Sequence, residues 1–364
     1  MSLDLSAPVP AVSPGARRPP LVPALGLLLA ALLGAVLVAL SSGSVAVPLE
    51  GTVSHLAQAM GLPGTPLSSR DLAVLVTLRL PRIVLAAAVG VTLGVAGASL
   101  QAIFRNPLAD PGLVGVSSGA AFAGSLTMVL GVSGFGLAAR GVSLAVLLPA
   151  MAFLGALSAT VLILMLARRA GRCSAADMLL AGIAVNALGA TGIGLCSYLG
   201  DDLALRQMTF WMMGGFGGAA WTQAAPALVL MALAAAGLMA NARRLDLYAL
   251  GERDAFLLGL DPHRFAVRTV LLVALGVGAA VAVSGLIGFV GLIVPHMMRL
   301  WLGPAHRRLL PATALAAATL LILADTAART IAAPADVPVG LLLGAVGAPV
   351  FLTLLRSRGG RLTA

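Results

Sequence analysis

Long apolar runs, separated by short polar segments, dominate the pattern of this 364-residue chain. A membrane-spanning helix needs about 20 predominantly apolar residues to cross roughly 30 Å of hydrocarbon. Ten runs approach that length, and we expect ten transmembrane helices, over residues 21–42, 82–104, 112–131, 142–167, 176–199, 222–242, 265–284, 286–302, 310–330 and 338–356. The pattern therefore predicts an all-α polytopic membrane protein, with a spanning unit over 21–356, an N-terminal segment over 1–20 and a tail over 357–364.

The seventh and eighth predicted helices form one apolar stretch that is broken by Ser284, Gly285, Gly288 and Gly291. Glycine punctuates helices and favours turns. We therefore expect a tight turn here and two helices, instead of a single very long one.

Composition supports the membrane assignment, because 60% of residues are apolar and only 10% are charged. All 23 basic residues are arginine, and their placement predicts orientation. With both termini in the cytoplasm, the cytoplasmic segments carry 17 arginines and the outer segments carry six. The positive-inside rule favours this topology. It also explains the basic pI near 11.5 without a nucleic-acid partner.

One polar segment interrupts the apolar pattern between residues 245 and 265, with seven charged or histidine side chains. A charge at the centre of a membrane helix costs about 2.5–3.5 kcal/mol on insertion scales, so the segment lies outside the bilayer. Its apolar residues recur with helical spacing at Leu247, Leu250, Phe256, Leu257 and Leu260. We expect residues 243–264 to form a cytoplasmic segment whose short amphipathic helix presses on a partner.

Several strings together resemble the permeases of ABC importers for iron-siderophores, haem and cobalamin. They are LRLPR (78–82), QAIFRNPLADPGLVGVSSGAA (101–121), LLAGIAVNA (179–187), LGERDAFLLGLD (250–261), GFVGLIVPHMMRL (288–300) and ADTAAR…DVPVG…GAPVF (324–351). The resemblance implies a homodimer of ten-span subunits in a bacterial inner membrane, with a central pathway. It also implies two ATPase subunits and a periplasmic binding protein as partners. The chain has no GxxxxGK[ST] phosphate loop, so we expect ATP hydrolysis on the separate ATPase subunit, and no enzymatic activity here.

The resemblance also implies roles for individual residues. ATPase coupling falls to Leu250, Gly251, Glu252, Ala255, Leu258 and Gly259. Docking of the binding protein, through salt bridges to its glutamates, falls to Arg79, Arg82 and Arg329. A cytoplasmic gate includes Asn106 and Leu108, while a second family gate uses small hydroxyl residues where this chain has Ala175 and Ala176.

Simpler interpretations stay open for several of these residues. The coupling segment could lie on lipid, Arg79 and Arg82 could only anchor the second span, and Asn106 could cap a structural turn. Asn186 could pack helices together or line the pathway, since a buried amide in a membrane helix usually bonds a neighbouring helix. Possible pathway residues also include Met212 and Met213, and Asp325 is expected to pair with Arg329 one helical turn away.

Isolated histidines such as His55 and His296 do not make a metal site, so we expect no resident metal and no covalently bound cofactor. Haem is the expected cargo, and cobalamin or a ferric siderophore is the alternative. A rival class is an ion-coupled secondary transporter, which would need buried acids or histidines in its spans. Apart from Asp325, the predicted spans offer almost none.

Overall fold

The computed structural model describes residues 19–43, 68–132, 143–169, 172–333 and 335–359, together with positions 51, 54 and 58. Residues 1–18 of the N-terminal segment, His55 and residues 360–364 of the C-terminal tail lie outside the described residues. The predictions for those residues stay predictions.

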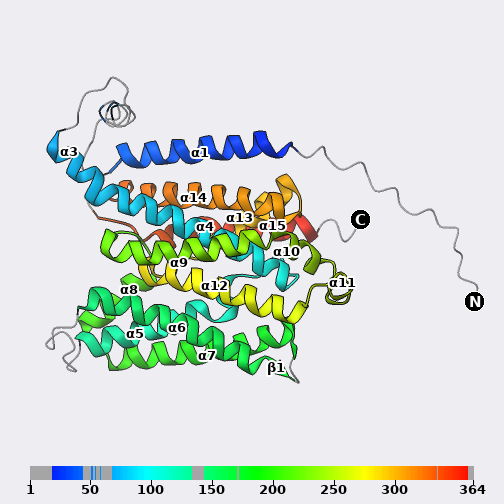
Figure 1. The fold of residues 1–364 in the computed structure, drawn as a ribbon. Coiled ribbons are helices and arrows are strands. Elements are labelled where there is room, and N and C mark those ends of the chain that lie inside the picture. Colours follow the sequence, from blue (N-terminus) through cyan, green and yellow to red (C-terminus); the bar gives the residue numbers. More distant parts are fainter. Residues whose placement is uncertain are drawn as a thin grey trace, which may run out of the picture.

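The described chain is almost wholly helical, which confirms the predicted fold class. Seven helices are long and apolar enough to span a membrane, and three shorter apolar helices accompany them in the described residues. Together these match the ten predicted spans, as α1 (Leu21–Ser41), α4 (Leu80–Ile103), α5 (Val116–Val132), α6 (Leu144–Leu166), α7 (Ala175–Leu199), α9 (Trp221–Ala240), α12 (Pro262–Ser284), α13 (Val290–Leu302), α14 (His306–Thr330) and α15 (Val339–Gly359). Figure 1 shows most of these helices running side by side.

Shorter elements connect the spans. They are α3 (Ser69–Ala73), the π-helix η1 (Val74–Arg79), the 3₁₀-helix η2 (Pro111–Val114), α8 (Asp202–Met212), α10 (Ala242–Ala249), α11 (Glu252–Leu257) and the two-residue strands β1 (Arg168–Arg169) and β2 (Arg172–Cys173). The two strands pair as an antiparallel hairpin after α6.

The second span begins earlier than predicted, because α3, η1 and α4 form one helical stretch from Ser69 to Ile103. Proline lacks an N–H group and its ring clashes with the preceding turn, which accounts for the wider π-helix just before Pro81. The predicted start at residue 82 was wrong because Arg79 and Arg82 interrupt the apolar run. Both side chains find partners inside the protein, so the helix continues through them.

The predicted turn between the seventh and eighth spans is confirmed. Helix α12 ends at Ser284, and Gly285 has φ +67°, a conformation that glycine adopts without strain. Helix α13 begins at Val290, a few residues after the predicted 286, and follows Phe289 in the left-handed region. The carbonyl of Ser284 accepts a hydrogen bond from Gly215 at 2.8 Å, which fixes this turn against the segment after α8.

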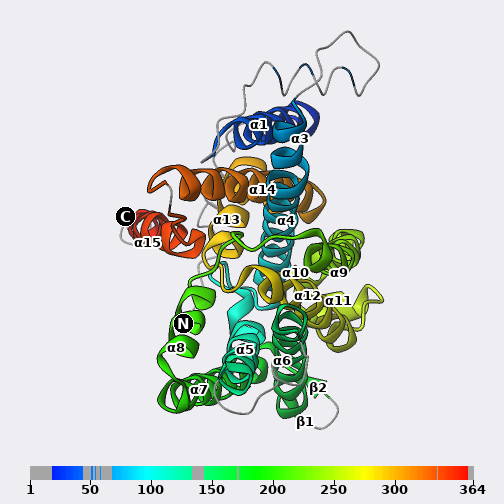
Figure 2. The same cartoon turned by 90° about the vertical axis from the view of Figure 1, so that its left-hand side faces the viewer.

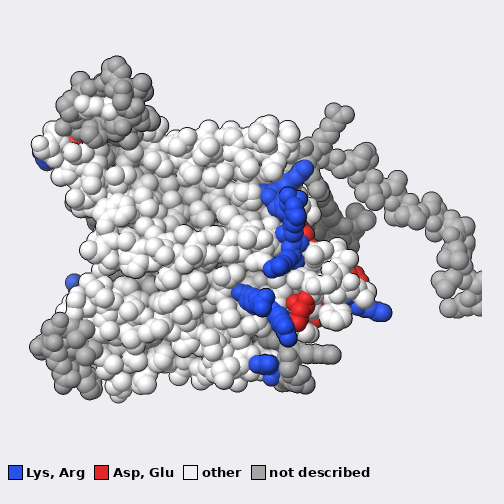
Figure 3. Space-filling model, in the orientation of Figure 1, with Lys and Arg blue, Asp and Glu red and all other residues white. Residues whose placement is uncertain are grey.

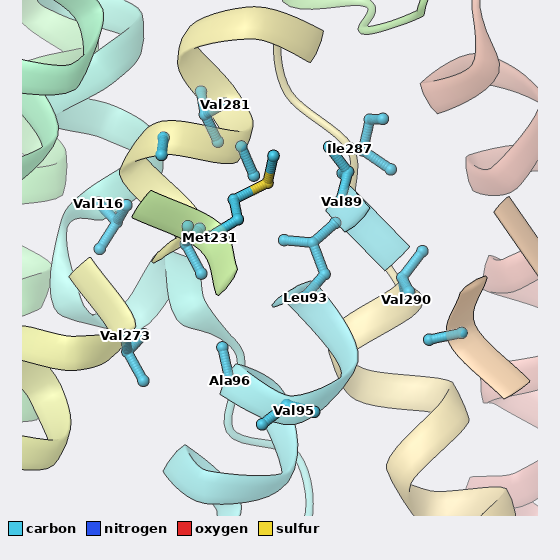
Figure 4. Packing of buried hydrophobic residues seen from close by; sticks show 14 of the residues in the cluster. Val89, Leu93, Val95, Ala96, Val116, Met231, Val273, Val281, Ile287 and Val290 are labelled. Atoms are coloured by element: carbon cyan, nitrogen blue, oxygen red, sulfur yellow. The ribbon is translucent and has the colours of Figure 1, made fainter. Parts of the chain in front are cut away.

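Helix α4 lies at the centre of the bundle and packs against α9, α12, α13 and α14. Figure 4 shows Leu93 of α4 between Met231 of α9 and Val290 of α13. Close approach depends on glycine, because a Cβ atom at Gly97 would overlap the backbone of Gly291 on α13. Small residues at such contacts let membrane helices pack by van der Waals attraction.

The surface of the bundle can be divided into two ends and two sides. Arginine side chains gather where α6 ends and α12 begins, as Figure 3 shows; we call this the arginine-rich end and the opposite one the far end. In Figure 2, α8 and α15 lie on one side of the bundle, and α9 and α11 lie on the other. Helix α7 exposes large apolar side chains, including Leu180, Ile183 and Leu188. A lipid bilayer or a partner must cover such faces.

Candidate functional site: the two ends of the bundle

The segment between the sixth and seventh spans forms two short helices, which corrects the expected single amphipathic helix. Helix α10 ends at Ala249, and Gly251 has φ +132°, which L-residues rarely adopt. Helix α11 then runs in a new direction from Glu252 to Leu257. Gly259, at φ +86°, ends this helix and returns the chain to α12. Helical spacing alone did not reveal these two breaks.

The predicted coupling residues separate into a buried anchor and an exposed apolar patch. Ala255 is completely buried, whereas Leu250, Phe256, Leu257 and Leu258 each expose more than half of their surface. We call these four residues the coupling patch. Gly251 and Gly259 flank α11 on either side, and Glu252 is half-buried at its start. The structure thus brings the predicted coupling residues together at the arginine-rich end.

Tyr248 and Asp246 fix α10 to α12, to α14 and to the turn after α4, and the sequence interpretation missed these contacts. The Tyr248 ring is almost fully buried, lies 5.8 Å from the Phe265 ring of α12, and receives the Arg105 guanidinium over its face at 5.4 Å. Asp246 accepts a hydrogen bond of 2.8 Å from the backbone N–H of His306 at the start of α14. The His306 Nδ1 atom lies 2.7 Å from the same carboxylate oxygen. The string YALGERD carries no signal for these contacts, because their partners lie far away in the sequence.

The predicted gate residues lie directly after Arg105, in a tight turn. The Asn106 side-chain oxygen accepts a hydrogen bond from the Leu108 backbone N–H at 2.9 Å, which is an Asx turn. This contact is the turn-capping role that the simpler interpretation expects of Asn106. The Leu108 side chain is 40% exposed. Asp110 caps η2 by accepting from the Gly112 N–H at 2.8 Å, and burial raises the pKa of its carboxyl group.

A second polar contact crosses the arginine-rich end between α4 and α13. Arg299 donates to the Gln101 side-chain oxygen at 2.8 Å, and Gln101 is buried. The Gln101 amide nitrogen lies 3.3–3.4 Å from the carbonyl oxygens of Gly291 and Leu292. Both residues fall inside the family strings, but only the structure shows that they contact each other.

At the far end, Arg82 joins three elements. Its guanidinium contacts Asp325 of α14 at 2.8 Å and Asp336, before α15, at 2.7 Å. Asp325 is buried and also lies 3.5 Å from Arg329, which confirms the expected pairing. The Arg82 side chain is 12% exposed and that of Asp336 is 46% exposed. Ionisable side chains within membrane helices usually pair with one another, and the Asp325 carboxylate here lies between two guanidinium groups.

Arg79 and Arg329 are buried and contact the end of the first helix. Arg79 donates to the Leu40 carbonyl, and Arg329 donates to the Ala39 carbonyl at 3.1 Å. The last carbonyls of a helix have no partner within the helix, and cationic side chains there are favourable. The two arginines therefore cap α1, and among the predicted docking residues Arg82 is the one that reaches a half-exposed partner.

The far end also holds a cavity of about 380 Å³ lined by Arg82, Asp336, Trp211 and Phe216. Met212 ends α8 and Met213 follows it, and both are half-buried. Their chain neighbours Trp211 and Gly214 line this cavity. Met208, one turn earlier, packs with Met128 and Cys196 in the protein interior. The structure thus brings the predicted docking arginine and the α8 residues to one region.

Asn186 is held between helices by both ends of its amide. It accepts from the Ser118 hydroxyl at 2.6 Å and donates to the Gly112 carbonyl at 3.1 Å. These bonds tie α7 to α5 and η2, as the packing interpretation of Asn186 expects. At the start of α7, Ser174 caps the helix by accepting from the Asp177 N–H at 3.1 Å. Ala175 follows as the first helical residue.

In the described residues, ten apolar helices form a bundle with an exposed apolar patch on a polar segment at one end and an ion network at the other, which is the architecture of a multi-pass membrane protein. Residues 29–357 match the FecCD transport family, and the chain belongs to this family.

Relatives agree with that assignment. The chain is 45% identical over 295 residues to the hemin transport system permease protein of Yersinia pestis, covering 78% of this chain and 84% of the relative. It is 40% identical over 302 residues to the vitamin B12 import system permease protein of Vibrio vulnificus, covering 80% and 86%. A solved structure, an inward-facing conformation of a metal-chelate type ABC transporter, is similar with a TM-score of 0.79. That similarity has 29% sequence identity and covers 92% of this chain and 98% of the other. These findings confirm the resemblance to ABC importer permeases.

Proposed function

We propose that this chain is the membrane permease of an ATP-driven importer that moves haem from a periplasmic binding protein into the cytoplasm. The chain acts as one of two identical subunits in the bacterial inner membrane. The arginine-rich end faces the cytoplasm and the far end faces the periplasm. ATP binds and is hydrolysed on two separate ATPase subunits.

The coupling patch is the single observation that carries this proposal. Four large apolar side chains, Leu250, Phe256, Leu257 and Leu258, are exposed on a segment too polar to enter the bilayer. An amphipathic helix in a groove of a partner protein buries such a face. The acidic residues Glu252 and Asp254 beside the patch disfavour an anionic membrane surface as the alternative. We therefore assign this patch to the ATPase subunit.

Contacts behind the patch supply a route from the ATPase to the gate. Tyr248 contacts both Arg105 and Phe265, and Asp246 holds the start of α14. A displacement of α10 and α11 would thus be passed to the turn of Asn106 and Leu108, directly after Arg105. Packed side chains with few voids transmit such displacements well.

We assign docking of the binding protein to the far end, with Arg82 as its direct contact. Asp336 is half-exposed and can leave Arg82 when a carboxylate of the binding protein replaces it. Arg79 and Arg329 contribute indirectly, because they hold the end of α1 beside that surface. Charges at the rim of an interface set orientation and association rate more than affinity.

The homodimer is assigned to the wall that carries α7, α8 and α15. Exposed apolar side chains on α7 and α15, such as Ile183 and Leu341, need a cover that a second copy supplies. In that arrangement Met212 and Met213 lie near the pathway between the subunits.

Haem is the preferred cargo because the hemin permease relative shares 45% identity, whereas two cobalamin permease relatives share 40% and 42%. Cobalamin is the second candidate, since several relatives carry that name. The ion-coupled alternative is disfavoured by Asp325, whose carboxylate is occupied by Arg82 and Arg329.

Uptake by proteoliposomes tests the proposal. They contain this chain, its ATPase and its binding protein, and receive haem, cobalamin or a ferric siderophore with ATP or a non-hydrolysable analogue. We expect uptake of haem that requires hydrolysis. ATP-driven uptake of cobalamin alone would support the importer mechanism but show that haem is not the cargo. Uptake driven by an ion gradient without ATP would overturn the importer.

The Leu257→Asp variant tests the coupling patch separately. It places a charge in the assigned interface at a position that is 75% exposed in the isolated chain, so folding is unaffected. We expect binding of the ATPase subunit to fall at least tenfold. Ala305→Asp, at an exposed site just before α14 near the same end, is the matched control with unchanged binding, because aspartate is a favourable N-cap residue. If both variants bound the ATPase subunit equally well, the coupling patch would not be part of the interface.

A further inference from the structure

A cavity at the arginine-rich end, distinct from the coupling patch, combines basic and apolar walls. It has a volume of about 590 Å³ and lies between the end of α6 and the start of α12. Its basic side chains are Arg168, Arg264 and Arg268, and its apolar side chains include Val161, Met165 and Leu271. The two sets line one cavity formed by α6, β1 and α12, so one occupant would touch both.

The charges in this cavity do not cancel. Asp261 is its acidic residue, and its carboxylate is already used by the Arg264 backbone N–H at 3.0 Å and by the Arg264 side chain at 3.2 Å. Arg168 and Arg268 are exposed and have no acidic partner within the described residues. Three guanidinium groups against one carboxylate leave a formal charge of +2, with His263 also on the wall.

The apolar wall is exposed as well. Val161 is 43% exposed, Met165 is 69% exposed and Leu271 is 39% exposed, and all three lie on helices long enough to span a membrane. These residues lie within about two helical turns of the arginines, on the side toward the middle of each helix. A second cavity of about 690 Å³ adjoins the first, shares Arg264 and Arg268, and adds Arg244 to the basic wall.

We propose that this cavity binds an anionic phospholipid, with its phosphate between Arg168, Arg264 and Arg268 and its acyl chains along Val161, Met165 and Leu271. Arginine is suited to phosphate because its planar fork donates two parallel hydrogen bonds. Basic pockets between spans on the cytoplasmic side are typical sites for anionic lipid headgroups. The apolar wall favours a lipid over a soluble phosphate, which would leave that wall uncovered.

The position of the cavity is compatible with this occupant. It lies on α6 and α12, in the part of the bundle away from α8 and α15, to which we assign the second copy (Figure 2). It also shares no residue with the coupling patch. The inference therefore needs only that the bundle spans a membrane, and it does not depend on the cargo.

Native mass spectrometry of the detergent-purified chain tests the proposal, with phosphatidylglycerol and phosphatidylethanolamine as the lipid probes and inorganic phosphate as the soluble anion. The Arg168→Gln/Arg268→Gln double variant removes two guanidinium groups from the cavity. Each arginine near an anionic surface is worth about a fivefold change in affinity, so we expect the double variant to lose roughly 25-fold for phosphatidylglycerol. Arg307→Gln/Arg308→Gln, which removes the same charge from exposed positions on α14, is the control and should change affinity less than twofold.

Four outcomes decide the matter. Selective phosphatidylglycerol binding that only the cavity variant loses supports the site. An equal loss of phosphatidylglycerol affinity in both variants would show that only the overall charge of this end matters, and it would overturn the proposed site. If millimolar inorganic phosphate displaced the lipid, the cavity would be a site for a soluble anion, and the proposed lipid occupant would be wrong. Unchanged phosphatidylglycerol binding by the cavity variant would show that these arginines do not hold the lipid and would overturn the proposal.

Discussion

At the residue scale, small side chains and buried ions decide where helices meet. The contact of Gly97 with Gly291 places two backbones closer than any side chain would allow. The Arg82–Asp325–Arg329 group provides the opposite kind of contact, in which charge is buried and balanced. Each contact leads to a substitution with a matched control elsewhere in the chain.

Gly97→Ala is expected to destabilise the bundle, because the added methyl group overlaps the Gly291 carbonyl on α13. Overpacking of this kind costs typically about 1–3 kcal/mol. Gly34→Ala on α1 is the control, since a Cβ atom there meets nothing within 4 Å. Thermal unfolding in one detergent measures both, and equal midpoints for the two variants would contradict the close approach of α4 and α13.

Asp325→Asn is expected to cost far more stability than Asp336→Asn. The first change leaves Arg82 and Arg329 buried without their shared counter-charge, a loss of about 3–5 kcal/mol for a broken buried pair. The second removes a half-exposed partner, and exposed pairs are worth about 0–1 kcal/mol. Denaturant titration of both variants checks the ranking, and similar losses would show that Asp325 is not the central residue of the network.

At the element scale, α10 and α11 are held by side chains that point inward, while their apolar patch points outward. Tyr248 is the residue on which this arrangement depends. It is almost fully buried and contacts α12 through Phe265 and the chain after α4 through Arg105. Its hydroxyl lies 3.5 Å from Glu252, the first residue of α11.

Tyr248→Leu is therefore expected to uncouple hydrolysis from transport. It keeps an apolar side chain in the core but loses both ring contacts, so the ATPase should still bind while uptake per ATP falls several-fold. Tyr248→Phe retains the rings and should lose little. The ratio of uptake to hydrolysis in proteoliposomes is the measurement. Equal ratios for Leu and wild type would exclude this route.

Sequence alone predicted the elements whose signal is local. Apolar runs indicated the ten apolar helices that the described residues form, and Ser284 and Gly285 marked the turn between α12 and α13. The coupling residues could be grouped from the family resemblance, because they are adjacent in the chain. The features that sequence did not predict depend on partners that are distant in the chain. Arg79 and Arg82 contact Leu40 and Asp325, and the local sequence therefore gives no sign that the helix continues through both arginines.

At the scale of the whole molecule, the separation of arginines between two ends predicts its orientation in the membrane. We expect Arg253→Cys on α11 to react with an impermeant maleimide only from the cytoplasmic side. Gly218→Cys at the far end, where a new side chain meets open space, should react only from outside. Both variants are made after Cys173 and Cys196 are replaced by serine. Reaction of both sites from one side would contradict the two-ended arrangement.

The capping of α1 has a consequence for biogenesis. Helix α1 is synthesised long before α14, yet only 11% of its spanning window is buried, and α14 is its main neighbour (Figure 1). Its last carbonyls are bonded by Arg79 and by Arg329, which lies 290 residues beyond Ala39. Helix α1 therefore cannot complete its cap until α14 has been inserted. Until then, the insertion machinery or lipid must hold α1 in place.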